Sequence, residues 1–154
     1  MPTLHPTAQR VAERLSAAGL DVTVVEHEES SRTAEEAAAT AGCQLGQIVK
    51  SLVFADDAGP VLVLCAGDRR VDAAALGLRR ATPDVVREAT GFAIGGVPPL
   101  GHPAPLRTLV DASLQRFETV WCAAGTPNAV FEVRTDALIA ALPDAEVREV
   151  AAPE

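Results

Sequence analysis

IVKSLVFADDAGPVLVLCA, at residues 48–66, holds the two apolar runs that decide the fold. The runs, residues 48–55 and 61–66, are rich in valine, isoleucine and leucine, and short apolar runs bounded by turn residues are typical of β-strands. Between them, Asp-Asp-Ala-Gly-Pro at residues 56–60 is typical of a turn. The stretch therefore predicts two central strands joined as a hairpin.

Shorter elements are predicted on both sides of this hairpin. Apolar residues recur at helical spacing over residues 7–19, and Thr33 with Glu36 has the form of a capping box at the start of a second helix that runs to about Ala41. Pro83 marks the first turn of another helix. The remaining expectations are strands over 21–26, 109–111, 120–123 and 129–133, one short apolar strand within 91–103, a short helix over 71–76 and a last helix over 135–142.

These elements predict one α+β domain over residues 1–154, with a mixed, largely antiparallel, barrel-like β-sheet and flanking helices. The strands outnumber the helices and gather in the middle of the chain. Hydrophobic residues make up 48% and charged residues 22%, which is close to the averages of globular domains. A chain of 154 residues is also long enough to bury a single core.

The charge balance limits the partners that this chain can bind over a large surface. Its formal net charge of −8 argues against a broad basic face, so DNA is not an expected partner and any contact with RNA is small. No apolar run is long enough to cross a bilayer and no leader-like start is found, which predicts a cytoplasmic protein without a membrane partner. Cys43, Cys65 and Cys122 are widely spaced, so neither a disulfide nor a zinc site is expected.

Lys50 is the only lysine of the chain, and it stands inside the first predicted strand. Period-two alternation puts it on the face of Ile48, Leu52 and Phe54, which is otherwise apolar. An ammonium group there either reaches water at the strand end or stays where a ligand or a carboxylate offsets its desolvation. From spacing alone, a solvated lysine at the sheet edge is the commoner arrangement.

The stretch GFAIGGVPPLGHP, residues 91–103, holds four glycines and three prolines. Glycine lets a ligand approach the backbone, and the N–H groups at Gly95 and Gly96 can stabilise a developing oxyanion while the prolines stiffen the loop. His102 follows, and a histidine can relay protons or donate to a phosphate near neutral pH. A turn without a ligand and an exposed histidine are the alternative interpretations.

Three other groups each allow a chemical and a structural interpretation. Cys122 lies in an apolar run, where a buried cysteine is a small hydrophobe more often than a nucleophile. Asp111 is either a strand-terminating turn residue or a pocket carboxylate, and Arg69 with Arg70 forms either a solvated turn or a phosphate clamp. No Gly-x-Ser-x-Gly, His-Glu-x-x-His, Gly-x-Gly-x-x-Gly or P-loop motif is present. The sequence therefore does not indicate a serine nucleophile elbow, a zinc hydrolase site, a dinucleotide site or a P-loop phosphate site.

Three motifs stand in order along the chain: TAEEAA at residues 33–38, QIVKSLVF at 47–54 and GGVPPLGH at 95–102. Together they resemble the YbaK/EbsC family, the editing-domain family associated with prolyl-tRNA synthetase. The likeness continues through Asp111 and residues 115–117 and 121–125, and it covers about residues 20–142. The ordered set is far more specific than any of its parts.

The resemblance implies a free-standing deacylase that hydrolyses the ester of mischarged tRNA, commonly tRNA for proline carrying a smaller amino acid. The family's invariant lysine falls on Lys50 and its Gly-x-x-x-Pro loop on residues 95–99, so the implied catalytic residues are Lys50, Gly95 and Gly96. In such enzymes the lysine interacts with the 3′ end of the tRNA, neither as a nucleophile nor as a base, while the loop holds the aminoacyl group. The implied substrate-binding residues are Val97, Pro98, Pro99, Gly101, His102, Asp111, Ala124 and Gly125.

The resemblance also implies the partners, which are the 3′ aminoacyl end of mischarged tRNA and prolyl-tRNA synthetase. It implies no metal and no organic cofactor. An aminoacyl ester is already activated, so positioning and oxyanion stabilisation can suffice for its hydrolysis.

The chain departs from the family's pattern in ways that bear on which amino acid is removed. It has no tyrosine for the pocket, Ala123 and Ala124 stand where some relatives have serine and glycine, and Pro98 stands where serine or threonine is common. Two other functions stay open: a non-catalytic module that binds tRNA or a synthetase, and a metabolite-binding protein unrelated to translation.

Overall fold

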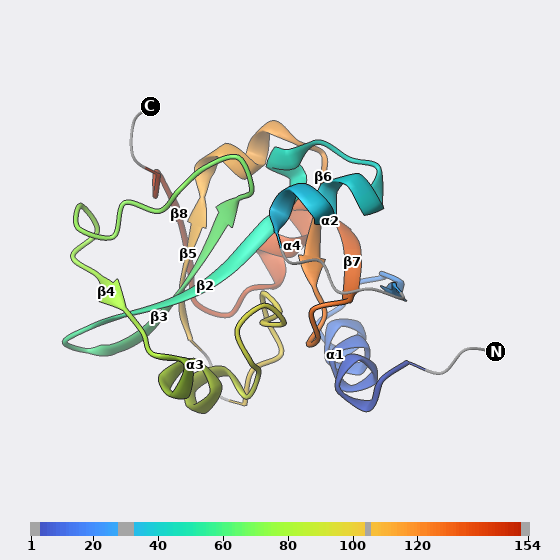
Figure 1. The fold of residues 1–154 in the computed structure, drawn as a ribbon, viewed down its shortest axis with the longest axis horizontal. Helices are drawn as coiled ribbons and strands as arrows, with labels where there is room; N and C mark the ends of the chain where they lie inside the picture. The colour runs from blue at the N-terminus through green and yellow to red at the C-terminus, as the bar shows by residue number, and fades with distance from the viewer. Residues whose placement is uncertain (1–3, 28–32, 104–105, 152–154) are drawn as a thin grey trace.

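The computed structural model describes residues 4–27, 33–103 and 106–151 of the chain. Its strands form one sheet of five strands and one of three, and helices pack around them (Figure 1). Most strand pairs are antiparallel, so the predicted α+β class with largely antiparallel pairing is confirmed. Within the described residues, no helix is both long and apolar enough to span a bilayer.

The predicted hairpin is the centre of the five-stranded sheet. β2 (Val49–Asp56) and β3 (Gly59–Ala66) pair antiparallel along their whole length. The carboxylate of Asp56 accepts hydrogen bonds from the main-chain N–H groups of Ala58 and Gly59, at 2.8 and 3.1 Å, and these bonds fix the turn. The hairpin prediction is confirmed.

Three further strands complete this sheet in the order β4-β2-β3-β5-β8. β5 (Arg107–Asp111) runs parallel to β3, and β8 (Ala145–Arg148) runs parallel to β5. β4 (Arg79–Arg80) pairs with β2 only at Phe54 and Ala55. β2 is therefore fully paired on the side of β3 and mostly unpaired on its other side.

The second sheet has the order β1-β7-β6 and is antiparallel. Its strands β1 (Val24–Glu26), β6 (Thr119–Ala123) and β7 (Ala129–Arg134) match predicted ones. One parallel bridge, between Ile48 and Trp121, connects the start of β2 to β6. Neither sheet closes on itself among the described residues, so the barrel-like form is not confirmed, because this one bridge is the backbone pairing found between the two sheets.

Four helices lie where the sequence predicts its main helices. They are α1 (Pro6–Ala17), α2 (Ala34–Ala41), α3 (Pro83–Thr90) and α4 (Thr135–Ala141). The Thr33 hydroxyl accepts from the N–H of Glu36 at 3.1 Å, so the predicted cap is present, and the Thr82 hydroxyl caps α3 in the same way by accepting from the N–H of Val85 at 3.3 Å. Two short 3₁₀ helices, η1 (Leu45–Gln47) and η2 (Ala112–Arg116), precede β2 and follow β5.

Four details of the prediction are wrong. Residues 71–76 form hydrogen-bonded turns rather than a helix, because Val71 is tied into a bridge with Ala151 and Gly77 turns the chain at φ +70°. Residues 91–103 contain no strand, since the prolines remove N–H donors that a ladder needs. β4 and β8 were not predicted, because they are short and all of their residues are exposed, so no buried apolar run marks them.

Apolar side chains form two clusters, one on each face of the five-stranded sheet. One cluster contains Val49, Val53 and Leu62, together with residues of the helices and of the second sheet. The other contains Phe54 and Val63 with neighbours from β5 and the residue 71–78 turn. The alternation of β2 thus sends neighbouring residues into different cores.

We expect Leu62→Ala to lower the free energy of unfolding by about 2–5 kcal/mol, because Leu62 is fully buried in the larger cluster and its truncation leaves a cavity. Urea denaturation followed by circular dichroism measures the change. Val85→Ala is the control, since Val85 is 37% exposed, and its effect should stay within about 0.5 kcal/mol. Equal losses in both variants would contradict this description of the core.

Candidate functional site

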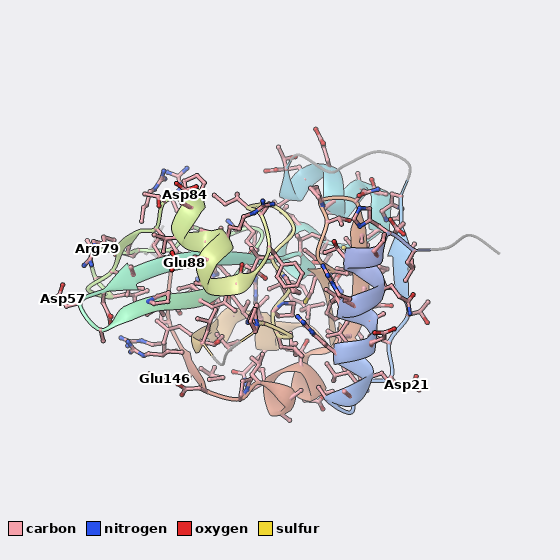
Figure 2. All side chains as sticks on the ribbon, turned by 90° about the horizontal axis from the view of Figure 1, so that it is seen from below. Asp21, Asp57, Arg79, Asp84, Glu88 and Glu146 are labelled. Atoms are coloured by element: carbon pink, nitrogen blue, oxygen red, sulfur yellow. The ribbon has the colours of Figure 1, made fainter. Side chains whose placement is uncertain are left out.

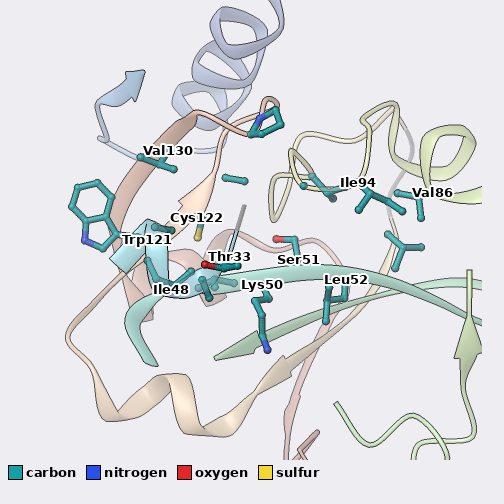
Figure 3. A pocket seen from close by; sticks show the side chains of 18 of the residues that line it. Thr33, Ile48, Lys50, Ser51, Leu52, Val86, Ile94, Trp121, Cys122 and Val130 are labelled. Carbon is teal, nitrogen blue, oxygen red and sulfur yellow. The ribbon is translucent and has the colours of Figure 1, made fainter. Parts of the chain in front are cut away.

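One cavity of about 540 Å³ lies where β2, β6 and the loop after α3 come together (Figure 3). The consecutive residues from Ile48 to Phe54 line it, and all of them except Ile48 belong to β2. Its other walls come from α2 and its cap, from α3 and the loop after it, from β6 and the start of β7, and from positions in or next to β1 and β4. These residues are Thr33, Ala34, Ala37 and Ala41; Ile94, Gly95 and Val97; Trp121, Cys122, Ala123, Pro127 and Val130; and His27, Arg80, Ala81 and Val86.

Consecutive residues can line one cavity only where it meets the edge of a strand, since a sheet face presents every second side chain. The edge of β2 away from β3 is paired at Ile48, by the bridge to Trp121, and at Phe54 and Ala55, by β4. Between these points no strand of the described part of the chain covers it. The cavity therefore lies against an open stretch of strand edge.

Lys50 lines this cavity, and its ammonium group donates a hydrogen bond to the main-chain carbonyl of Arg69. Figure 3 shows Lys50 and Leu52 projecting from one side of β2, whereas Ser51 projects from the other side, toward Cys122 and Ile94. The predicted alternation is confirmed. In this conformation the ammonium group lies on the side of the strand away from Ile94.

The glycine loop reaches the cavity through Gly95 and Val97. Gly95 has φ +93°, a conformation that favours glycine. Gly96 is buried behind it: its N–H donates to Ala93 at 3.0 Å, and its carbonyl accepts from the N–H of Gly125 at 2.9 Å. A Cβ on Gly96 would lie 2.7 Å from the Gly125 carbonyl oxygen, so only glycine fits this contact.

His102 supports the loop from behind the cavity wall. Its Nε2 lies 2.8 Å from the Pro98 carbonyl oxygen, and because a carbonyl only accepts, Nε2 carries the proton. The ring also packs edge-on against Phe92, with ring centroids 6.4 Å apart. Burial lowers the pKa of His102 from its ordinary value of 6.5. Next to it, Gly101 at φ +89° accepts a hydrogen bond from the Arg14 guanidinium.

The remaining predicted site residues lie outside the cavity wall. Asp111 is fully buried, and its carboxylate accepts from the N–H groups of Ala66 at 3.0 Å and Ser113 at 2.9 Å, which ties the end of β5 to β3. Ala124 is also fully buried, and its N–H donates to Ala129 at 2.8 Å. Of the predicted set, Lys50, Gly95 and Val97 meet at the cavity, whereas Gly96, Pro98, Pro99, Gly101, His102, Asp111, Ala124 and Gly125 do not line it.

Cys122 lines the cavity, but its chemistry is not that of a nucleophile. The residue is 1% exposed, and burial raises the pKa of its thiol, so the thiol stays protonated. Arg69 pairs with Glu149 at 3.4 Å, while Arg70 is exposed, which agrees with the solvated turn. Among the described side chains, no group of three or more histidine, cysteine, aspartate or glutamate residues could hold a metal ion.

Sequence reasoning overlooked two parts of the wall. Ser51 follows Lys50 in an otherwise apolar stretch, and this isolated hydroxyl could have marked Ser51 as a candidate site residue. Ala34, Ala37 and Ala41 recur at helical spacing on the cavity side of α2, where small side chains leave room. The polar Ser51 and the alanine face thus belong to the site as well.

Comparison with known proteins agrees with this geometry. The sequence model of the aminoacyl-tRNA editing domain family matches residues 28–141. A solved structure of a candidate trans-editing enzyme for prolyl tRNA synthetase superposes with a TM-score of 0.91 at 44% identity, over 98% of this chain and 100% of that one. The uncharacterized protein YwhH of Bacillus subtilis (strain 168) is 39% identical over 71% of this chain and 74% of its own length.

A proline–tRNA ligase of Nitratidesulfovibrio vulgaris (strain DP4) is also similar. It is 33% identical over 92 residues, which are 55% of this chain but only 16% of the ligase. The similarity therefore concerns one segment of that larger protein. The resemblance predicted from the three ordered motifs is confirmed.

Gly96→Ala should lower the free energy of unfolding by about 1–3 kcal/mol, because the added methyl group meets main-chain atoms of Gly125 that cannot rotate away. Chemical denaturation measures this loss. Ile94→Ala in the same loop, where Ile94 is 59% exposed, should change stability little. A Gly96→Ala protein as stable as the wild type would show that the contact is not tight.

His102 should make stability depend on pH. Since its pKa in the folded protein is below the ordinary 6.5, the unfolded chain binds the proton more readily, and the free energy of unfolding should fall as the pH drops below about 6.5. Thermal unfolding at several pH values, compared with His102→Gln, isolates this contribution. The difference between the two proteins should be constant above pH 6.5 and shrink below it; a difference that does not vary with pH would contradict the assignment.

Proposed function

This chain belongs to the aminoacyl-tRNA editing domain family, and from that premise we propose that it is a deacylase that acts in trans on mischarged tRNA in the cytoplasm. It hydrolyses the ester between the amino acid and the 3′ end of the tRNA. The observation that carries the proposal is that Lys50 lines one cavity of about 540 Å³ together with Gly95 and Val97 of the glycine loop. This volume is within the range of small-molecule sites.

We propose tRNA for proline as the tRNA, with a smaller amino acid attached to it. The similarity to a segment of a proline–tRNA ligase and to a candidate trans-editing enzyme for prolyl tRNA synthetase supports this choice. The cavity wall is mostly apolar, which supports an amino acid with an apolar side chain. Prolyl-tRNA synthetase is the proposed second partner, because an acidic chain of net charge −8 has little surface for the body of the tRNA.

The proposed chemistry needs no nucleophilic side chain. The main-chain N–H groups of Gly95 and Val97 stabilise the oxyanion that forms when water attacks the ester carbonyl. The N–H of Gly96 is already bonded to Ala93, so its part is to hold the loop. The thiol of Cys122 stays protonated and contributes shape to the wall.

Lys50 holds the tRNA end in this proposal. Its ammonium group lies on the side of β2 away from Ser51, and its partner among the described residues is a neutral carbonyl, that of Arg69. A cation without a carboxylate partner suits a phosphate group of the terminal nucleotides.

We expect the wild-type protein to release alanine or another small amino acid from mischarged tRNA for proline, and Lys50→Ala to reduce kcat/KM about 10- to 100-fold, because a hydrogen bond between charged groups is lost. Release of radiolabelled amino acid from a panel of mischarged tRNAs measures both. Arg79→Ala is the matched control, since Arg79 is a cation paired with Asp57 at the far tip of the hairpin (Figure 2).

Two results would contradict the proposal. One is release no faster than the uncatalysed reaction with every tRNA of the panel. The other is equal release by the wild type and Lys50→Ala, which, with tight binding to the synthetase, would instead favour a non-catalytic binding module.

A further inference from the structure

The Ser51 hydroxyl is a polar atom without a partner in the cavity wall. Its oxygen is buried, and it makes no hydrogen bond to any described residue. Leaving a buried hydroxyl unpaired costs about 1–3 kcal/mol of stability. Val49 and Val53, its neighbours on the same face of β2, are apolar and belong to the larger core cluster. An alanine or valine at position 51 would fit this wall without leaving a buried hydroxyl unpaired. The stability of the fold therefore does not explain why a serine stands here.

The main-chain N–H and carbonyl of Ser51 face the edge of β2 that no strand of the described residues covers at this point. The turn between β2 and β3 has two residues, and the pair Asp56↔Gly59 closes it. In such a hairpin the two residues of the closing pair exchange main-chain hydrogen bonds, and every second pair along the ladder is hydrogen-bonded in the same way. Phe54, Leu52 and Lys50 therefore direct their main-chain N–H and carbonyl groups toward β3. Ser51 directs its N–H and carbonyl to the opposite edge, in the interval between the bridge of Ile48 and the pairing with β4.

Ser51 lines the cavity, and it carries three hydrogen-bonding groups: a donor, an acceptor, and a hydroxyl that can be either. An aminoacyl ester carries a matching set in its α-amino group, which donates, and its ester carbonyl, which accepts. We propose that the open edge of β2 at Ser51 binds the α-amino and ester groups of the aminoacyl end. This inference rests on the proposed function and adds a positioning residue to it.

The placement predicts how Ser51 affects selectivity. The groups that it binds are common to all aminoacyl esters, whereas the amino acid side chain meets the apolar walls. Loss of the hydroxyl should therefore slow the release of every accepted amino acid by a similar factor. A residue that selects among amino acids would change their ratio.

Ser51→Ala and Ser113→Ala test the inference as a pair, because the Ser113 hydroxyl is also buried without a partner but lies outside the cavity wall. Both variants should melt at or above the wild-type temperature, since each removes an unpaired buried group. Only Ser51→Ala should lose kcat/KM, by about 10-fold or more, and Ser51→Thr should restore much of it by restoring the hydroxyl.

Binding of an amide-linked alanyl-adenosine analogue, measured by calorimetry, separates this inference from the proposed function. If the wild type binds the analogue and Ser51→Ala does not, the inference holds even where no hydrolysis is found. If the wild type hydrolyses mischarged tRNA and Ser51→Ala is equally active, the inference is overturned and the proposed function stands. A melting temperature of Ser51→Ala several degrees below that of Ser113→Ala would also overturn it, because the hydroxyl would then be structural.

Discussion

The site depends on the incomplete pairing of β2. Its partner β3 covers one edge for the full length of the strand, which makes the hairpin rigid. On the other edge, β4 pairs only with Phe54 and Ala55, and one bridge at Ile48 reaches the second sheet. A strand held firmly on one side and left open on the other offers fixed hydrogen-bonding groups to a ligand. It also presents side chains from both of its faces to one cavity.

The residues behind the cavity wall keep this arrangement in place. Gly96 and Gly125 make a main-chain contact that admits no Cβ, and His102 holds the Pro98 carbonyl. The buried carboxylate of Asp111 joins the ends of β3 and β5. These residues carry family motifs without lining the cavity. Their part is to position the loop and the sheet, which is a physical reason for glycine, histidine and aspartate at these places.

The central part of the fold could be predicted from the sequence because its signals are local. The hairpin of residues 48–66 shows two apolar runs and a turn, and the helices begin at threonine caps such as Thr33. β4 and β8 could not be predicted, because they are short and exposed and their partners are distant in the sequence. The barrel-like form is not confirmed, and the pairing between sheets that decides it is a property of the tertiary structure that local signals do not show.

The site, like the fold, could be predicted in part from local sequence and depends in part on the tertiary structure. The motifs pointed to Lys50 and the glycine loop, and both line the cavity. What the motifs could not show is which loop residues face the ligand, since Gly95 and Val97 line the cavity and Gly96 does not. Nor did they reveal Ser51, whose importance follows from an absent partner rather than from its residue type. Such an absence becomes visible only when the neighbours of the residue are known.

The central claim is that the open edge of β2 and the glycine loop together hold an aminoacyl group. A crystal structure of the protein with an amide-linked alanyl-adenosine analogue tests it most directly. We expect the alanyl group in the cavity between Ser51 and Gly95, with its amino and carbonyl groups within hydrogen-bond distance of Ser51. An analogue bound elsewhere on the protein, with this cavity empty, would show that the open edge of β2 and the glycine loop do not form the aminoacyl site.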